Sequence, residues 1–170
     1  MKRISDEIWV RLSTEQDSAE IEMLLDSCFG AMSLKDFKEN ICDRYLLAFI
    51  DNRLVGMTGL YFNKDYNGFE VDWTCTHPDY RKKGIMHKLF KRICALTDED
   101  IYCSCWGMRG KDINLKSVMY DFGFNPVVRN RVTWNLRYNC RSGRNGDCIM
   151  SHEWANCSCY EDLYLRRAKH

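Results

Sequence analysis

The chain has 170 residues, of which 45% are hydrophobic and 29% charged, a balance typical of a folded globular protein rather than a disordered one. Its formal net charge of +1 argues against DNA or an anionic membrane as a partner. No apolar run approaches the ~20 residues that a membrane span needs, and the N-terminal sequence MKRISDEIWVRL lacks the apolar stretch of a signal peptide. We therefore expect a cytoplasmic protein that binds neither nucleic acid nor a membrane.

The first part of the chain predicts one strand and two helices. Residues 8–12 form the strand, and Ser13 and Gln16 have the spacing of a capping box at the start of a helix. Apolar residues then recur at helical spacing until Gly30, which ends this helix. Ser33 is the expected cap of a second, shorter helix.

A three-stranded meander follows. Its strands are predicted over residues 45–50, 54–62 and 69–76, and the first two meet at a turn signal over residues 51–53. A helix with one apolar face is predicted from residue 83 to about residue 96.

The last part of the chain is predicted to contain both strands and a helix. We expect a strand over residues 101–105, a helix over 114–122 that Gly123 ends, and an alternating strand over 127–138. The final strand is predicted over residues 159–165.

This order of elements indicates the fold class. Strands and helices alternate without segregating, which predicts an α/β fold of the mixed-sheet (α+β) kind, with helices on both faces of the sheet. No internal repeat or linker is present, so residues 1–170 are expected to form one domain. A turn-rich loop insertion is expected at about residues 139–158.

The segment VDWTCTHPDYRKKGIMHKLF, residues 71–90, predicts an anion site. A strand breaks at a proline, a basic turn follows, and an amphipathic helix starts at once. Backbone N–H groups in the first turn of a helix point outwards, and the helix dipole adds positive charge. Gly84 permits close approach of a ligand, and Arg81, Lys82 and Lys83 add charge for phosphates. From these residues alone, a plain structural turn remains the alternative.

The sequence from His77 to Met86, HPDYRKKGIM, resembles the pyrophosphate motif of the GNAT superfamily of acyl-CoA-dependent N-acyltransferases, Arg/Gln-x-x-Gly-x-Gly/Ala. Met86 stands where that family usually has glycine or alanine. The order of elements from Ile8 to Leu165 resembles the same family. The resemblance implies a GNAT-like fold and acetyl-CoA as co-substrate.

The resemblance also implies which residues bind that co-substrate. Backbone groups of Thr74, Cys75 and Thr76 are expected to pair with the pantetheine arm. The other expected cofactor-binding residues are Arg81, Lys82, Lys83, Gly84, Ile85, Met86, His87 and Asn114.

Two residues are candidates for proton transfer. Glu70 lies eleven residues before Arg81, where several family members place the general base, and Asp72 on the same predicted strand is its rival. For either carboxylate, a solvated strand residue is the alternative. Tyr120 is the candidate proton donor to the CoA thiolate, although the family's tyrosine stands one residue earlier, at the position of Met119.

These roles predict an N-acetyltransferase that passes an acetyl group from acetyl-CoA to a primary amine of a small molecule or peptide, by direct attack in a ternary complex. A covalent intermediate on Cys75 is disfavoured, because no histidine is placed beside it and a core thiol is the simpler interpretation. The alternative function is an acyl-CoA sensor without turnover. A homodimer is left open.

A group of cysteines near the C-terminus is a second candidate site, with His152 among them: Cys140, Cys148, Cys157 and Cys159. Four thiolates could hold a tetrahedral zinc ion. Their intervals lack the Cys-x-x-Cys pair of common zinc sites, so we predict no metal and interpret them as unmetallated thiols. A zinc-binding interaction module is the remaining alternative function.

Overall fold

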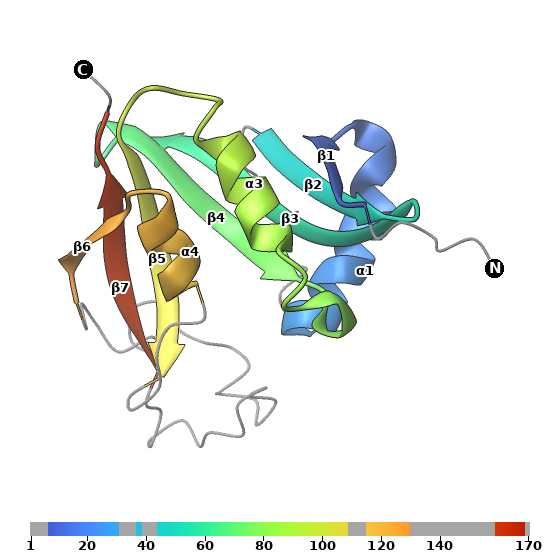
Figure 1. Ribbon diagram of the computed structural model, residues 1–170. Helices are drawn as coiled ribbons and strands as arrows, with labels where there is room; N and C mark the ends of the chain where they lie inside the picture. The colour runs from blue at the N-terminus through green and yellow to red at the C-terminus, as the bar shows by residue number, and fades with distance from the viewer. Residues whose placement is uncertain (1–6, 31–36, 39–43, 109–114, 130–158, 169–170) are drawn as a thin grey trace. The chain divides into compact units, whose positions relative to one another are not determined.

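The computed structural model describes residues 7–30, 37–38, 44–108, 115–129 and 159–168. Seven strands form one sheet in the order β1-β2-β3-β4-β5-β7-β6 (Figure 1). The strands are β1 (Trp9–Leu12), β2 (Arg44–Ile50), β3 (Arg53–Asn63), β4 (Gly68–Thr76), β5 (Ile101–Met108), β6 (Asn125–Val128) and β7 (Cys159–Arg166). The helices are α1 (Ser18–Phe29), α3 (Ile85–Ile93) and α4 (Lys116–Asp121), with the short 3-10 helices η1 (Glu15–Asp17) and η2 (Pro78–Tyr80). The predicted mixed α/β fold is confirmed.

Most predicted elements are present, and their ends differ by a few residues. The helix expected from residue 83 begins at Ile85 and ends at Ile93, whereas the strand expected over 101–105 continues to Met108. Of the second predicted helix, the structure describes residues 37–38, which are helical. Most of the predicted strand 127–138 and the whole predicted loop 139–158 lie outside the described residues.

The chain divides into two compact units. Unit 1 comprises residues 1–62 and 71–98, and unit 2 comprises residues 63–70 and 99–170. Strands β3 and β4 each contribute residues to both units. None of the helices in the described parts of the chain is long and apolar enough to cross a membrane.

In unit 1, β1, β2 and β3 pair antiparallel. The hairpin between β2 and β3 turns at Asp51 and Asn52, whose φ angles of 47° and 62° are the left-handed values that a two-residue type I′ turn requires. Aspartate and asparagine adopt this conformation more readily than most residues do. The turn that the sequence predicts at this point is therefore present, and it fixes the register of the two strands.

Helices α1 and α3 cover opposite faces of the strands of unit 1. Leu24 and Leu25 of α1 pack in one apolar cluster with Met57 of β3. The preceding residue, Gly56, faces α3, since successive residues of a strand point to opposite faces. A Cβ atom at Gly56 would lie 2.6 Å from Ile85 Cγ2, so the glycine allows the first turn of α3 to lie close against the sheet.

In unit 2, β5 and β7 pair antiparallel along their whole length, and β6 pairs with the other edge of β7. The loop before β5 is fixed by Asp100, whose carboxylate accepts hydrogen bonds from Arg167 Nη1 (2.9 Å) and Ala168 N (2.7 Å). Helix α4 ends before Gly123, and Phe124 N then donates to Met119 O (2.9 Å). Val118, Met119 and Phe124 are buried.

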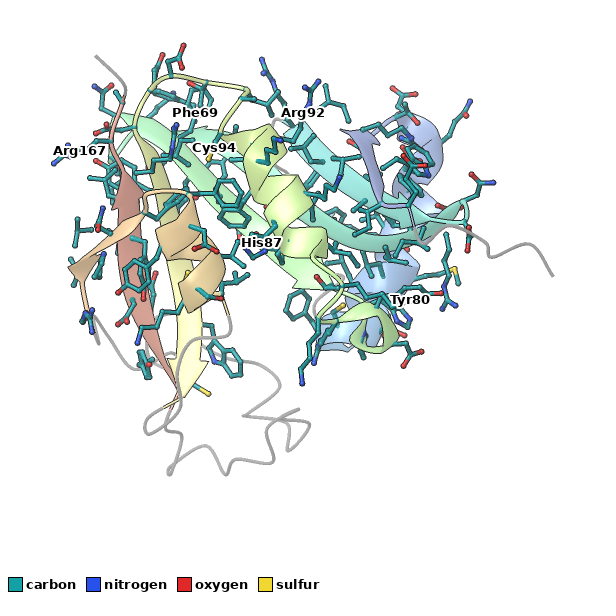
Figure 2. The ribbon with its side chains drawn as sticks, viewed as in Figure 1. Phe69, Tyr80, His87, Arg92, Cys94 and Arg167 are labelled. Carbon is teal, nitrogen blue, oxygen red and sulfur yellow. The ribbon has the colours of Figure 1, made fainter. Side chains whose placement is uncertain are left out.

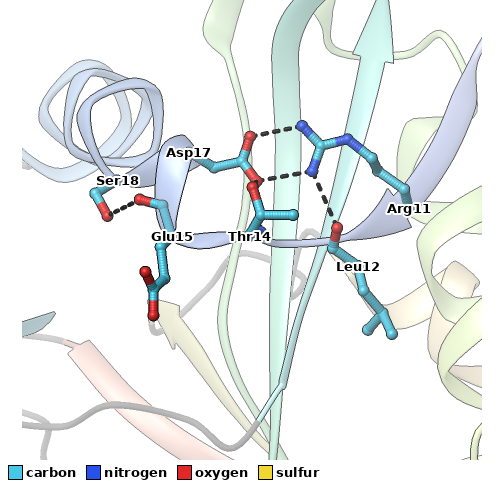
Figure 3. Close-up of polar contacts among 6 residues, drawn as sticks. All are labelled: Arg11, Leu12, Thr14, Glu15, Asp17 and Ser18. Atoms are coloured by element: carbon cyan, nitrogen blue, oxygen red, sulfur yellow. Dashed lines mark hydrogen bonds and ion pairs between the residues drawn. The ribbon is translucent and has the colours of Figure 1, made fainter.

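The capping box lies one residue later than the sequence predicts. Thr14 N donates to Asp17 Oδ2 (2.6 Å), and the Thr14 hydroxyl donates to the same oxygen (2.9 Å), so the box pairs Thr14 with Asp17 and the expected pair of Ser13 and Gln16 is wrong (Figure 3). Arg11 decides the position. Its Nη1 and Nη2 donate to the two carboxylate oxygens of Asp17 at 2.7 and 2.5 Å, a bidentate pair that a glutamine at position 16 could not form.

Replacing Asp17 by asparagine should lower the free energy of unfolding by about 2 kcal/mol, because one amide oxygen then replaces a carboxylate that accepts four hydrogen bonds. We expect less than for a fully buried pair, since the Arg11 side chain is 35% exposed. The Arg11 hydrogen bond lowers the pKa of Asp17 well below its ordinary value of 3.8. The stabilisation is therefore complete above this value and is lost as the pH falls below it.

Urea unfolding of both proteins at about pH 7 and about pH 3 tests this prediction. The stability difference between wild type and variant should be smaller at the lower pH. An equal difference at both pH values would contradict it.

Candidate functional site

The turn between β4 and α3 consists of residues of unit 1. The chain leaves β4 at His77, whose backbone N–H donates to Val55 O of β3 (2.9 Å). The His77 ring then caps η2, because its Nδ1 accepts from Asp79 N (3.3 Å). The turn is thus attached to the sheet before the basic residues begin.

The backbone of this turn has the form of an anion site. Lys82 has a φ of 63°, and Gly84, the N-cap residue of α3, has a φ of 81° and a ψ of 10°. Left-handed residues in such a turn direct successive N–H groups to one side, where they can hold an anion. No side chain caps α3, and a Cβ atom at Gly84 would meet nothing within 4 Å. The start of the helix is therefore open to a ligand.

Cationic side chains gather around the same turn. Arg81, Lys82 and Lys83 are exposed, and Lys83 Nζ lies 5.4 Å from the centre of the Tyr80 ring. Figure 2 shows Tyr80 in the turn and His87 on α3. His87 is exposed and Met86 half-buried.

Arg53 is a cation that the sequence interpretation missed. Its guanidinium carbon lies 5.4 Å from the centre of the Tyr80 ring, and its Nη2 lies 3.3 Å from His77 Nε2. Arg53 stands at the start of β3, 24 residues before His77. The predicted meander offers the only signal for it, because antiparallel pairing brings the start of one strand beside the end of the next.

The end of β4 carries a local irregularity at Trp73, whose φ of 49° is rare for a bulky side chain. Trp73 N donates to Asp72 Oδ1 (2.7 Å). Beyond it, the Thr74 hydroxyl forms a hydrogen bond with that of Thr58 (2.8 Å). Strain of this kind collects at functional sites, and no pattern in the sequence indicated it.

Cys75 lies in the same segment and is buried. The pKa of its thiol is raised well above the ordinary value, mainly because the thiol donates a hydrogen bond to the sulfur of Cys28 and also because it is buried. A thiol held in its protonated form is a poor nucleophile. This geometry supports the interpretation of Cys75 as a core residue.

In unit 2, Glu70 is buried, with 8% of its surface exposed. Its Oε2 accepts from Asn63 Nδ2 (2.6 Å) and its Oε1 accepts from the Ser104 hydroxyl (3.0 Å). These two donors, an amide and a hydroxyl, are uncharged, and they orient the carboxylate. Asp72, the rival candidate on the same strand, is exposed.

Tyr120 and Met119, which are neighbours on α4, differ in how far they are exposed to solvent. Met119 is fully buried, whereas Tyr120 is 40% exposed, as expected for neighbours that a helix separates by ~100°. The Tyr120 hydroxyl accepts a hydrogen bond from Arg129 Nη2 (3.4 Å), and its ring lies edge-on to Tyr164 with centroids 6.3 Å apart. Burial raises the pKa of Tyr164 to about 12, so Tyr164 stays protonated.

The sequence interpretation also missed Glu161. It is fully buried on β7, where it stands opposite Trp106 of β5. Ser104, the partner of Glu70, lies on the same face of β5 as Trp106, since the two are two positions apart in the strand. The sequence did hold a signal for Glu161: it is a charged residue on the same face of the predicted strand as the apolar Leu163 and Leu165.

Comparison with known proteins assigns the chain to a protein family. The family model of the acetyltransferase (GNAT) family matches residues 7–108, which is more than half of the sequence. The chain belongs to this family. Membership in this family makes acetyl-CoA the acyl donor of this chain, as the sequence predicts.

Solved structures show the same GNAT fold at low sequence identity. The ribosomal-protein-S18-alanine N-acetyltransferase of Escherichia coli is 12% identical with a TM-score of 0.61, over 94% of this chain and 91% of that one. A GNAT family N-acetyltransferase of Escherichia coli, solved in complex with CoA, is 15% identical with a TM-score of 0.54, over 69% of this chain and 68% of that one.

The N-acetylglutamate synthase of Neisseria gonorrhoeae, solved with coenzyme A and N-acetyl-glutamate, is 15% identical with a TM-score of 0.59. The alignment covers 96% of this chain but only 36% of the synthase. No curated protein matched the chain.

Within this GNAT chain, the structure brings one group of predicted site residues together. The segment Thr74–Thr76 and the residues Arg81–His87 all belong to unit 1, whereas Glu70 and Tyr120 belong to unit 2. Asn114 lies outside the described residues, as do Cys140, Cys148 and Cys157. Cys159 begins β7 and is buried. Among the side chains that the structure describes, no three metal-ligating groups come together.

Proposed function

We propose that this GNAT protein transfers the acetyl group of acetyl-CoA to a primary amine of a small molecule or peptide, by direct attack within a ternary complex. The observation that carries the proposal is the open start of α3, with its left-handed Lys82 and Gly84. N–H groups of residues Lys82 to His87 would hold the diphosphate of the CoA, and Arg81, Lys82 and Lys83 would add charge. Arg53 extends this positive surface.

The pantetheine arm would pair with the backbone of Thr74, Cys75 and Thr76, as an added strand does. A backbone N–H in this segment is the proposed donor to the tetrahedral oxyanion. Asn114 stays a predicted cofactor contact. The protonated state of Cys75 supports direct transfer over a covalent acyl-cysteine.

Proton transfer requires two further groups. The acceptor amine must be neutral to attack, and its nitrogen must lose a proton as the new bond forms. Glu70 is the proposed base, acting directly or through a water molecule. The CoA thiolate leaves and takes up a proton, for which Tyr120 is the proposed donor. The choice of acceptor, a homodimer and a cytoplasmic location stay predictions.

Two measurements on the full chain test the proposal. Acetyl-CoA should raise the thermal unfolding midpoint, because a ligand that binds only the folded state stabilises it. An amine panel should then give acceptor-dependent release of CoA, quantified by chromatography because the ten cysteines of the chain would react with thiol reagents. Binding without release by any amine would favour the acyl-CoA sensor. An unchanged midpoint would contradict both functions.

A further inference from the structure

Cys103 and Cys105 form a pair of buried thiols on β5, within unit 2. Residues two positions apart in a strand point to the same face of the sheet, and the two sulfur atoms lie 3.6 Å apart. Neither cysteine is in a disulfide, and only 2% and 3% of their surfaces are exposed. The proposed acetyl transfer uses neither thiol.

The pair lies on the face of β5 that helix α4 covers. Tyr164 of β7 stands directly opposite Cys103, and its ring lies edge-on to that of Tyr120 on α4. Helix α4 has only six residues, so it depends on its packing for stability. We therefore expect local openings of α4 to expose the two thiols to a small reagent while the sheet stays folded.

The distance between the two sulfurs suits a single atom that bonds to both. With bonds of about 2.3 Å, the length of a zinc–thiolate bond, such an atom spans 3.6 Å at an S–X–S angle of about 103°. A linear two-coordinate metal ion would need sulfurs ~4.6 Å apart at the same bond length. A disulfide is also disfavoured, because Cα atoms two positions apart in a strand are ~6.7 Å apart, at the upper end of the range for disulfides.

The number of protein ligands narrows the choice of bridging atom. A structural zinc ion takes four ligands, but no three metal-ligating groups come together in the described parts of the chain. Trivalent arsenic is pyramidal, with three bonds, and as a soft centre it prefers thiolate ligands. An organoarsenical brings one of its three substituents with it. Two thiols therefore complete its coordination.

We propose that Cys103 and Cys105 form a dithiol site that captures trivalent organoarsenicals of the form R–As=O. Each Sγ bonds to arsenic, both bonds of the As=O group break, and the two thiol protons leave with the oxygen as one water molecule. Arsenic stays trivalent and neither sulfur is oxidised, so the step needs no oxidant or reductant. The second As–S bond forms within one molecule, and its high effective concentration makes the bridge resist competing single thiols.

The test adds phenylarsine oxide to the fully reduced full-length chain, in excess 2-mercaptoethanol to remove arsenic from single cysteines. The chain is then unfolded and its remaining thiols are alkylated with one label. Next, 2,3-dimercaptopropanol removes the arsenical, a second label marks the released thiols, and peptide mass spectrometry maps both labels. We expect the second label on Cys103 and Cys105. The rate of uptake should level off as the reagent concentration rises, because opening of α4 limits it.

Single substitutions supply the controls. Cys103→Ser and Cys105→Ser should each abolish the capture that resists 2-mercaptoethanol, because one thiol cannot form the bridge. Cys94→Ser removes a half-buried thiol at the end of α3 and should leave capture unchanged.

The wild-type map alone decides the outcome if the serine variants of the pair do not fold. A wild-type chain that takes up no arsenical would overturn the proposal, as would a second label on other cysteines in place of Cys103 and Cys105. Capture that persists in a folded Cys103→Ser or Cys105→Ser variant would overturn it as well. The readout is the mass of labelled peptides, so the result is independent of acetyl transfer.

Discussion

Replacing Gly84 by alanine should weaken the binding of acetyl-CoA about tenfold, which corresponds to about 1.4 kcal/mol of binding free energy. Gly84 holds a φ of 81° at the N-cap of α3, a conformation that costs an alanine about 1 kcal/mol or more. The added Cβ meets no protein atom within 4 Å, so the fold stays intact while the turn relaxes away from its left-handed form. The N–H groups around it then lose their common direction. Isothermal titration with acetyl-CoA measures the change.

Gly30→Ala is the control for the cost of placing a side chain at a positive φ outside the proposed site; its ψ of 164° differs from the 10° of Gly84. Gly30 also has a φ of 81°, and a Cβ atom there also meets nothing within 4 Å. Both variants should therefore lose stability, but only Gly84→Ala should lose affinity. Equal affinities in both variants would show that the turn at Gly84 does not hold the CoA, and the proposed binding mode would fail.

The fold was predictable where local patterns decide the structure. The turn at Asp51 and Asn52 fixed a hairpin, because few residues tolerate positive φ and these two do. The apolar face of α3 was evident from its helical spacing, and its first turn was recognisable from the glycine and the basic residues before it. Each of these features depends on residues within a few positions of one another.

Features that depend on contacts between distant residues were not predictable. Asp17, rather than Gln16, forms the capping box because Arg11 approaches it from β1, and only the folded chain shows this approach. Gly56 reads as an unremarkable strand residue until Ile85 lies against it. The left-handed backbone of Trp73 has no local signal at all, because bulky residues disfavour that conformation and tertiary contacts must impose it.

The candidate site likewise has a part that local sequence determines and a part that contacts between distant residues determine. The proposed anion-binding turn is local, because all of its residues lie on one short segment of the sequence. The environment of the candidate base is not local, since Glu70 is oriented by Asn63 and by Ser104, which lies 34 residues away. The ring partner of Tyr120 likewise comes from a distant element.

Replacing Glu70 by glutamine should lower kcat about a hundredfold, the lower end of the range that a general base contributes. The acetyl-CoA affinity should be unchanged, because the amide removes the proton acceptor and leaves the proposed CoA-binding turn of unit 1 intact. A small loss of stability is expected as well, since a glutamine side chain at this position would offer one acceptor oxygen to two donors, Asn63 and Ser104. Rates of CoA release at saturating acetyl-CoA, with the thermal midpoint recorded for each protein, separate these effects.

Asp72→Asn provides the control for the loss of one carboxylate on β4. Asp72 is exposed, and an asparagine oxygen can still accept the hydrogen bond of Trp73 N, so its kcat should change less than about threefold. Tyr120→Phe in the same assay tests the proposed proton donor, for which a fall in kcat with unchanged KM is expected. A large loss in Asp72→Asn together with an active Glu70→Gln would transfer the role of base to Asp72. Comparable small losses in both would mean that water alone removes the proton, and that the buried carboxylate of Glu70 serves to join β4 to Asn63 and Ser104.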